Sequence, residues 1–179
     1  YAVFMDADGS HVPEFIRDLY KCNDGYDVVI ASRYIDGGAT DDNKILMLMS
    51  KIVNIIYSLV LNLSYKDISN SFKLYKANLL KNLKLNCNNF DVVEEILFKL
   101  KKANKDLRVK EIPYAFKKRM FGHTKRNLFL FALSYIVTLI ELRFDKSNFF
   151  RTYNISIRQV KSLIRKLSQF VFKIHRGAV

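Results

Sequence analysis

The sequence predicts an α/β fold built on an open sheet, and three observations support this prediction. Two runs of β-prone apolar residues, at 1–5 and 27–34, each end in polar side chains. Segments between and after them carry the spacing of amphipathic helices. Half of the 179 residues are hydrophobic, which is enough for one domain with a substantial core.

The first strand leads directly into Asp6, Ala7, Asp8 and Gly9. Alternate side chains of an extended chain share a face, so Asp6 and Asp8 can converge while Ala7 turns away. Ligands of open α/β sheets bind at such strand ends, and carboxylate oxygens suit Mg²⁺ or Mn²⁺. Two aspartates at a strand end are also common turn formers, so this pattern alone leaves both interpretations open.

The second strand also ends in polar residues. A short helix beginning at Pro13 and ending near Gly25 precedes it. The strand at 27–34 finishes with Ser32 and Arg33. We therefore expect two strands to bring acids and a guanidinium to the same edge of the sheet.

The remaining elements of the domain follow from periodicity. Residues 44–62 predict a long helix, and its lysines and asparagines favour a packed or bilayer-resting helix over a membrane span. Residues 71–75 alternate as a strand. The helix predicted at 91–104 begins with acids and ends with lysines, which suits its dipole. Pro113 breaks the strand at 107–116 and indicates a sheet edge.

A basic loop and two apolar segments complete the chain. Arg119, Gly122, Thr124 and Lys125 offer a guanidinium, a tight turn, a hydroxyl and an ammonium, which a diphosphate could use; a solvated basic loop is the alternative. The thirteen uncharged residues at 128–140 form about 20 Å of helix, too short to cross a hydrocarbon core of about 30 Å.

The C-terminal residues from 155 onward predict a basic amphipathic helix. Such a helix fits adhesion to anionic lipid, or packing on its own domain with a solvated basic face. We therefore divide the chain into a catalytic domain, 1–127, and membrane-associated amphipathic helices, 128–179. Lys and Arg number 30 against 17 Asp and Glu, and the net charge of +13 predicts polyanionic partners.

Taken in order, the motifs resemble those of the polyprenyl-phosphate sugar transferases of glycosyltransferase family 2, typified by dolichyl-phosphate mannosyltransferase. The resemblance covers residues 1 to about 127. The matching pieces are Asp6 to Pro13, Val28 to Tyr34 with Gly37 and Gly38, Ser50 with Asn54, Asp67 ahead of Ser71 to Tyr75, Glu111 to Pro113 with Phe116, and Arg119 with Gly122, Thr124 and Lys125.

The resemblance implies a GT-A fold, a Rossmann-like α/β domain of which this chain holds the C-terminal two-thirds. It implies Mg²⁺ or Mn²⁺ bound by Asp6, Asp8 and Ser10. It also implies a nucleotide sugar bound by Asp6, Asp8, Arg119 and Lys125. Because the chain begins inside a strand pattern, we expect an N-terminal part that would hold the nucleotide base.

For the acceptor phosphate the resemblance implies Arg33 and Ser50. The family usually carries an arginine four residues before this serine, where this chain has Leu46, and Lys44 is the expected substitute. The predicted catalytic residues are Asp8, Arg33 and Arg119.

The implied reaction transfers mannose from GDP-mannose, or glucose from UDP-glucose, to a polyprenyl or dolichyl phosphate with inversion. It implies an anionic membrane surface as a partner, no nucleic acid, and a cytoplasmic membrane face: endoplasmic reticulum in a eukaryote, plasma membrane in a prokaryote. One alternative is a hydroxyl acceptor, with Glu94 or Glu95 as general base. The other is a nonenzymatic basic module that binds membrane or nucleic acid.

Overall fold

The computed structural model describes residues 1–86, 91–118, 120, 138–140 and 142–143. The chain divides into two compact units, Tyr1–His123 and Thr124–Val179, and the fold below is that of the first. The predicted boundary between residues 127 and 128 lies outside the described residues. So do almost all residues of the predicted C-terminal helices, which stay a prediction.

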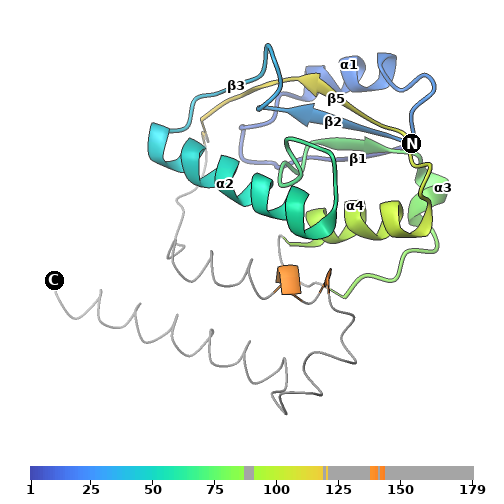
Figure 1. Ribbon diagram of the computed structural model, residues 1–179. Coiled ribbons are helices and arrows are strands. Elements are labelled where there is room, and N and C mark those ends of the chain that lie inside the picture. The colour runs from blue at the N-terminus through green and yellow to red at the C-terminus, as the bar shows by residue number, and fades with distance from the viewer. Residues whose placement is uncertain (87–90, 119, 121–137, 141, 144–179) are drawn as a thin grey trace, which may run out of the picture. The chain divides into compact units, whose positions relative to one another are not determined.

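A mixed four-stranded sheet forms the centre of the first unit (Figure 1). Its order is β1-β4-β2-β5, with β4 antiparallel to both neighbours and β2 parallel to β5. Two further short strands, β3 and β6, pair in parallel as a separate sheet. The strands are β1 (Ala2–Phe4), β2 (Val28–Ser32), β3 (Ala39–Thr40), β4 (Lys73–Tyr75), β5 (Val109–Pro113) and β6 (Ala115–Phe116). The α/β architecture is confirmed and is compatible with a Rossmann-like fold.

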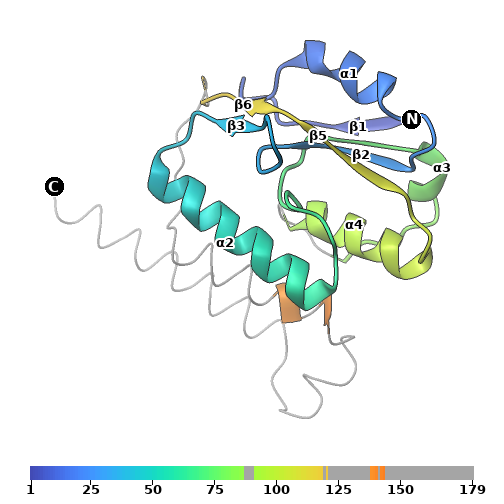
Figure 2. The same cartoon turned by 45° about the horizontal axis from the view of Figure 1, so that its top comes forward.

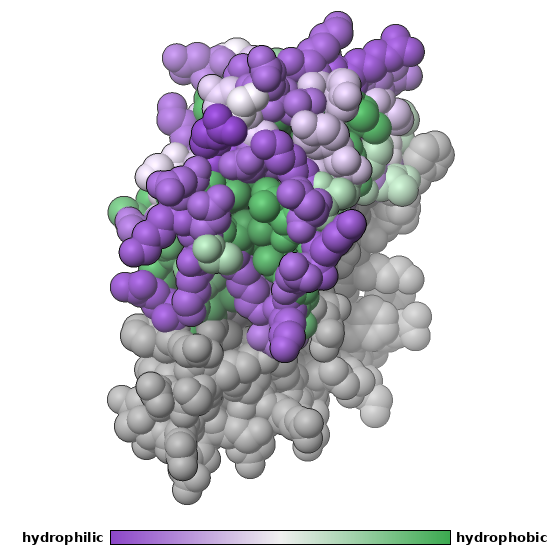
Figure 3. Space-filling view, turned by 90° about the vertical axis from the view of Figure 1, so that its right-hand side faces the viewer, coloured by the Kyte–Doolittle hydropathy of each residue, from purple (hydrophilic) through white to green (hydrophobic). Residues whose placement is uncertain are grey.

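Helices lie on both faces of this sheet. In Figures 1 and 2, α1 lies on one side, and α2 and α4 lie on the other. The helices are the 3₁₀ turn Pro13–Phe15, α1 (Ile16–Lys21), α2 (Lys44–Leu61), α3 (Ala77–Leu80) and α4 (Val92–Ala103). On the face shown in Figure 3, a small apolar area of the first unit is bordered by hydrophilic side chains.

The core is built around β2, all five residues of which are buried. Helices on one face and on the other exclude water from both sides of the strand, so an uninterrupted apolar run is needed. The buried core cluster has seven residues, of which Val29 and Ala31 belong to β2: Leu19, Val29, Ala31, Phe72, Leu74, Ile112 and Tyr114. As predicted, the strand ending at Pro113 lies at the edge of the sheet.

Helix α2 has one packed face and one apolar exposed face. Asn43 caps it by accepting a hydrogen bond from the Leu46 N–H at 2.8 Å, and it ends at Asn62 in the left-handed region. Asn54 and Tyr57 are buried, whereas Leu59 is 76% exposed. Within the described part of the chain, α2 is the one helix long and apolar enough to cross a membrane.

Candidate functional site

The ends of β1 and β2 deliver polar residues to the same edge of the sheet. Both strands run antiparallel to β4, so they point in one direction. Asp6 and Asp8 follow β1, and Arg33 follows β2 directly. The predicted juxtaposition of acids and guanidinium at one edge therefore agrees with the strand directions.

The loop at Asp8 is a tight turn closed by Ser10. The Asp8 Oδ1 atom accepts hydrogen bonds from the Ser10 N–H at 3.1 Å and from the Ser10 hydroxyl at 2.5 Å. Gly9 has φ +83°, and a Cβ there would lie 2.7 Å from Cε of Met120. Ser10 is completely buried, so its hydroxyl orients the carboxylate, and its predicted role as a metal ligand stays a prediction.

Asp6 is fixed by a second set of contacts. Its Oδ1 accepts a hydrogen bond from the Ser71 hydroxyl at 3.0 Å, and its N–H donates to Nδ1 of His11 at 2.8 Å. The buried His11 ring stacks on Phe72. Because Nδ1 accepts, Nε2 carries the proton and donates to Oδ1 of Asn70 at 3.1 Å.

His11 was not predicted as a site residue, and it connects the two strand ends. Asn70, its partner, donates to the Ala31 carbonyl, two residues before Arg33. Burial lowers the pKa of His11 below its usual value, although the charges of Asp6 and Asp8 oppose this. Its neighbours in the sequence, Asp8 and Ser10, give the one signal that could have identified it.

The segment leading to the basic loop runs beside the Asp8 turn. Lys117 donates its N–H to the Ser10 carbonyl at 3.2 Å, and Met120 donates its N–H to the Asp8 carbonyl at 3.0 Å. Arg119 and Lys125 themselves lie outside the described residues, so their predicted phosphate contacts stay a prediction.

The acids suit a cation that is shared with a substrate. Among the described residues, no group of three or more His, Cys, Asp or Glu could hold a metal ion. Mg²⁺ commonly takes one or two carboxylates from the protein and completes its shell with phosphate oxygens and water. Asp6 and Asp8 fit that pattern, and they do not fit a cage made of protein ligands alone.

Arg33 is the centre of a second polar cluster. Its Nε and Nη2 each lie 2.8 Å from an oxygen of Asp67, a bidentate pair with side chains 9% and 0% exposed. Nη2 also reaches Ser50 at 3.4 Å and Ser69 at 3.3 Å. Burial opposes the charge of Arg33, but the hydrogen bond and charge of Asp67 outweigh it and raise its pKa.

The structure thus brings Arg33 and Ser50 together, as the resemblance implies, and adds Asp67 and Ser69. Among the residues the structure describes, Nη1 of Arg33 has no hydrogen-bond partner. Lys44 is exposed at the start of α2, six residues before Ser50 and about 9 Å along the axis. Its proposed phosphate contact stays a prediction.

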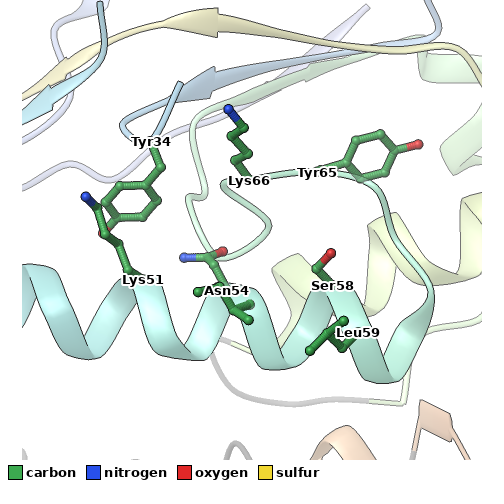
Figure 4. Close-up of a pocket in the computed structure, with 8 residues that line it drawn as sticks. Tyr34, Lys51, Asn54, Ser58, Leu59, Tyr65 and Lys66 are labelled. Atoms are coloured by element: carbon green, nitrogen blue, oxygen red, sulfur yellow. The ribbon is translucent and has the colours of Figure 1, made fainter. Parts of the chain in front are cut away.

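A cavity of about 360 Å³ opens beside this cluster (Figure 4). It is lined by Tyr34, Lys51, Asn54, Ile55, Ser58, Leu59, Tyr65 and Lys66. Tyr34 follows Arg33 in the chain and Lys66 precedes Asp67, so the cavity and the cluster share two segments. Lys51 lies beside Tyr34, with Nζ 5.6 Å from the ring centroid. The cavity therefore combines an apolar wall with two ammonium groups.

Glu94 and Glu95 are completely buried in α4. Glu95 accepts from the Asn86 N–H at 2.8 Å and pairs with Lys99 at 2.7 Å. A general base must reach the hydroxyl it deprotonates, and side chains with no exposed surface leave no room for one. Their burial counts against the alternative of a hydroxyl acceptor.

Comparison with known proteins agrees with the motifs. No protein-family model matches the chain. It is 31% identical over 126 residues to the polyprenol monophosphomannose synthase of Mycolicibacterium smegmatis, and the aligned region covers 69% of this chain and 48% of that protein. It is 29% identical over 127 residues to the undecaprenyl-phosphate mannosyltransferase of Micrococcus luteus, with 69% and 51% covered. The chain spans about half the length of these curated relatives.

The α/β sheet with polar strand ends is compatible with these relatives, both of which are named for mannosyl transfer. The resemblance predicted from the ordered motifs is confirmed as a similarity to proteins with these two names.

Proposed function

We propose that the protein transfers mannose from GDP-mannose to a polyprenyl phosphate, with inversion at the anomeric carbon. The proposal rests on the buried Arg33 cluster, which lies at the same edge of the sheet as Asp6 and Asp8. A reaction between two anions needs such an arrangement, with one site for each. The GT-A form of the Rossmann-like fold belongs to the same proposal.

At the donor end, Asp6 and Asp8, with Ser10 as a further candidate, would hold Mg²⁺ or Mn²⁺. When bound, the cation would neutralise charge on the departing diphosphate. Arg119 and Lys125 would contact the same diphosphate. The hydrogen bond from the Met120 N–H to the Asp8 carbonyl supports this, because it brings the chain beside Arg119 to the acidic turn.

At the acceptor end, Arg33 would orient the lipid phosphate through Nη1 and Ser50 would add a hydroxyl. A phosphate monoester has a second pKa of about 6, so its oxygen is already nucleophilic at neutral pH and needs no strong base. A phosphate oxygen forms a bond to the anomeric carbon as the bond to the diphosphate oxygen breaks on the opposite face. In-line displacement inverts the centre.

The cavity beside Arg33 would receive the first apolar units of the lipid. Its wall includes Ile55 and Leu59, and Lys51 and Lys66 add positive charge where the phosphate would enter. Lys44, at the start of the same helix, would extend this positive region.

The apolar exposed face of α2 supports association with a membrane. We place the enzyme on the cytoplasmic face of the endoplasmic reticulum in a eukaryote or of the plasma membrane in a prokaryote. The basic residues of 128–179 would bind anionic lipid there, and nucleic acid is not among the proposed partners.

The test is an assay of the full-length protein in membranes that contain polyprenyl phosphate. Radiolabelled GDP-mannose and UDP-glucose are supplied in turn. We expect label from GDP-mannose in the organic extract and its release by mild acid, because a sugar phosphodiester is acid-labile. Label that stays in sugar or protein products resistant to mild acid would contradict the proposal, and label from UDP-glucose alone would change the donor.

A further inference from the structure

The loop 66–70, between α2 and β4, carries both Asp67 and Ser69, the partners of Arg33. Its peptide groups lie outside helix and strand, so other groups must satisfy their hydrogen bonds. Asn54 of α2 accepts from the Ser69 N–H at 2.9 Å, and two charged side chains act on the two ends of the loop. Glu111 of β5 accepts hydrogen bonds from N–H groups at the beginning of the loop, and Lys73 of β4 donates to carbonyl groups toward its end.

Glu111 fixes the backbone of Lys66 and of Asp67, the residue that pairs with Arg33. Its Oε2 accepts a hydrogen bond from the Lys66 N–H at 2.9 Å, and its Oε1 accepts one from the Asp67 N–H at 2.9 Å. Hydrogen bonds to an ionised acceptor are roughly twice as strong as neutral ones. Glu111 therefore fixes the backbone of Asp67, while the Asp67 carboxylate forms the ion pair with Arg33.

Lys73 holds the other end of the same loop. It is completely buried on β4, the strand between β1 and β2. Its Nζ donates to the Ile68 carbonyl at 2.9 Å and also to the Asn70 carbonyl. Burial lowers the pKa of Lys73 to about 8, and the charge of Glu94 opposes this. A buried ammonium is costly unless it is paired and hydrogen-bonded, and here the loop carbonyls are its hydrogen-bond acceptors.

Glu94 of α4 interacts electrostatically with Lys73. Its carboxylate is completely buried, and neither oxygen has a hydrogen-bond partner among the described residues. Burial raises the pKa of Glu94 to about 8, against the opposing charge of Lys73.

We propose that Lys73 and Glu111 are positioning residues for the acceptor phosphate: by fixing the loop 66–70 they make Asp67 and Ser69 hold Arg33 in its binding orientation. This inference rests on the proposed function, because it assigns a task at the acceptor end of that site. Both residues act through the loop, and neither is a catalytic residue.

The test uses the full-length protein in detergent micelles, with Lys73→Met and Glu111→Gln made separately. The KM for polyprenyl phosphate and the KM for GDP-mannose are measured independently, and urea unfolding checks the fold. We expect the acceptor KM to rise about tenfold or more while the donor KM stays within about twofold, because only the acceptor end is disturbed.

Lys76→Met is the matched control. Lys76 follows β4 directly and pairs with Asp27 at 2.8 Å, so this change removes a lysine and its polar contact without touching the loop. We expect it to leave both KM values unchanged. If Lys73→Met does not fold, Lys73→Arg, which keeps the charge, takes its place beside Glu111→Gln, and we expect an acceptor KM between those of wild type and Glu111→Gln.

A second measurement separates positioning from a general structural effect. In an Asp67→Asn background, Glu111→Gln should change the acceptor KM by less than about twofold, because its route to Arg33 is already broken. A folded Glu111→Gln with an unchanged acceptor KM, or an equal rise in both KM values, overturns the inference. A wild-type protein that neither binds nor mannosylates polyprenyl phosphate overturns the proposed function as well.

Discussion

Replacing Arg33 by methionine removes the cation from an almost wholly buried pair. The side chains of Arg33 and Asp67 are 9% and 0% exposed, and Nη2 lies 2.8 Å from Oδ1. The change would leave the Asp67 carboxylate buried without its partner, which costs about 3–5 kcal/mol. The double variant Arg33→Met/Asp67→Asn also removes the unpaired charge of the buried Asp67 carboxylate. We therefore expect it to regain most of the stability but none of the transfer activity.

Urea unfolding and kcat/KM for polyprenyl phosphate, measured on the full-length protein, check both parts. We expect the single and the double variant to lose about 100-fold or more in kcat/KM, since both lack the phosphate ligand. Lys21→Met is the control: Lys21 and Asp18 form an exposed pair at 3.9 Å, and breaking it should leave stability unchanged. Transfer activity regained by the double variant would refute the assignment of Arg33 to the acceptor phosphate.

Four other predictions concern the acidic turn, the pH dependence of stability and the cavity. Gly9→Ala should cost about 1–3 kcal/mol in urea unfolding because φ is +83°, and Met120→Ala in the same chain should not restore it, since the strain is in the backbone. Asp8→Asn should abolish the thermal shift that Mn²⁺ with a nucleoside diphosphate gives the full-length protein; an undiminished shift would contradict the metal assignment. Burial opposes ionisation of Asp27, but Lys76 and Arg108 outweigh it and lower its pKa. The stability from Asp27 is thus present above its usual pKa and lost as pH falls through the lowered value, so Asp27→Asn should flatten the acid side of a urea titration. Ile55→Ser should raise the KM for long-chain more than for short-chain polyprenyl phosphates, and an equal rise would argue against the cavity as the lipid site.

Local patterns predicted the elements that carry the site. The strands at 1–5 and 27–34 and the helix at 44–62 agree with β1, β2 and α2, because each has a run of residues with one clear period. Short elements were missed. β3 is two residues long and exists only through its pairing with β6, so no periodicity in its own sequence could indicate it.

Partners far apart in the sequence could not be predicted. Nothing local says that Arg33 meets Asp67, 34 residues later, because the strand order of the sheet decides it. The same holds for His11 and Asn70. Glu94 and Glu95 have the positions of solvent-exposed acids at a helix N-terminus, yet both are buried, and Glu95 pairs with Lys99.

In the proposed enzyme, a metal-bound donor and an anionic lipid acceptor meet at one edge of the sheet. Mn²⁺ is paramagnetic, so the ³¹P signal of a short-chain polyprenyl phosphate bound to the full-length protein reports its distance from the metal. We expect strong broadening with Mn²⁺ and nucleoside diphosphate, none with Mg²⁺, and loss of the broadening in Asp8→Asn. A lipid phosphate that binds, as shown by its dependence on Arg33, but keeps a sharp signal beside Mn²⁺ would contradict this arrangement.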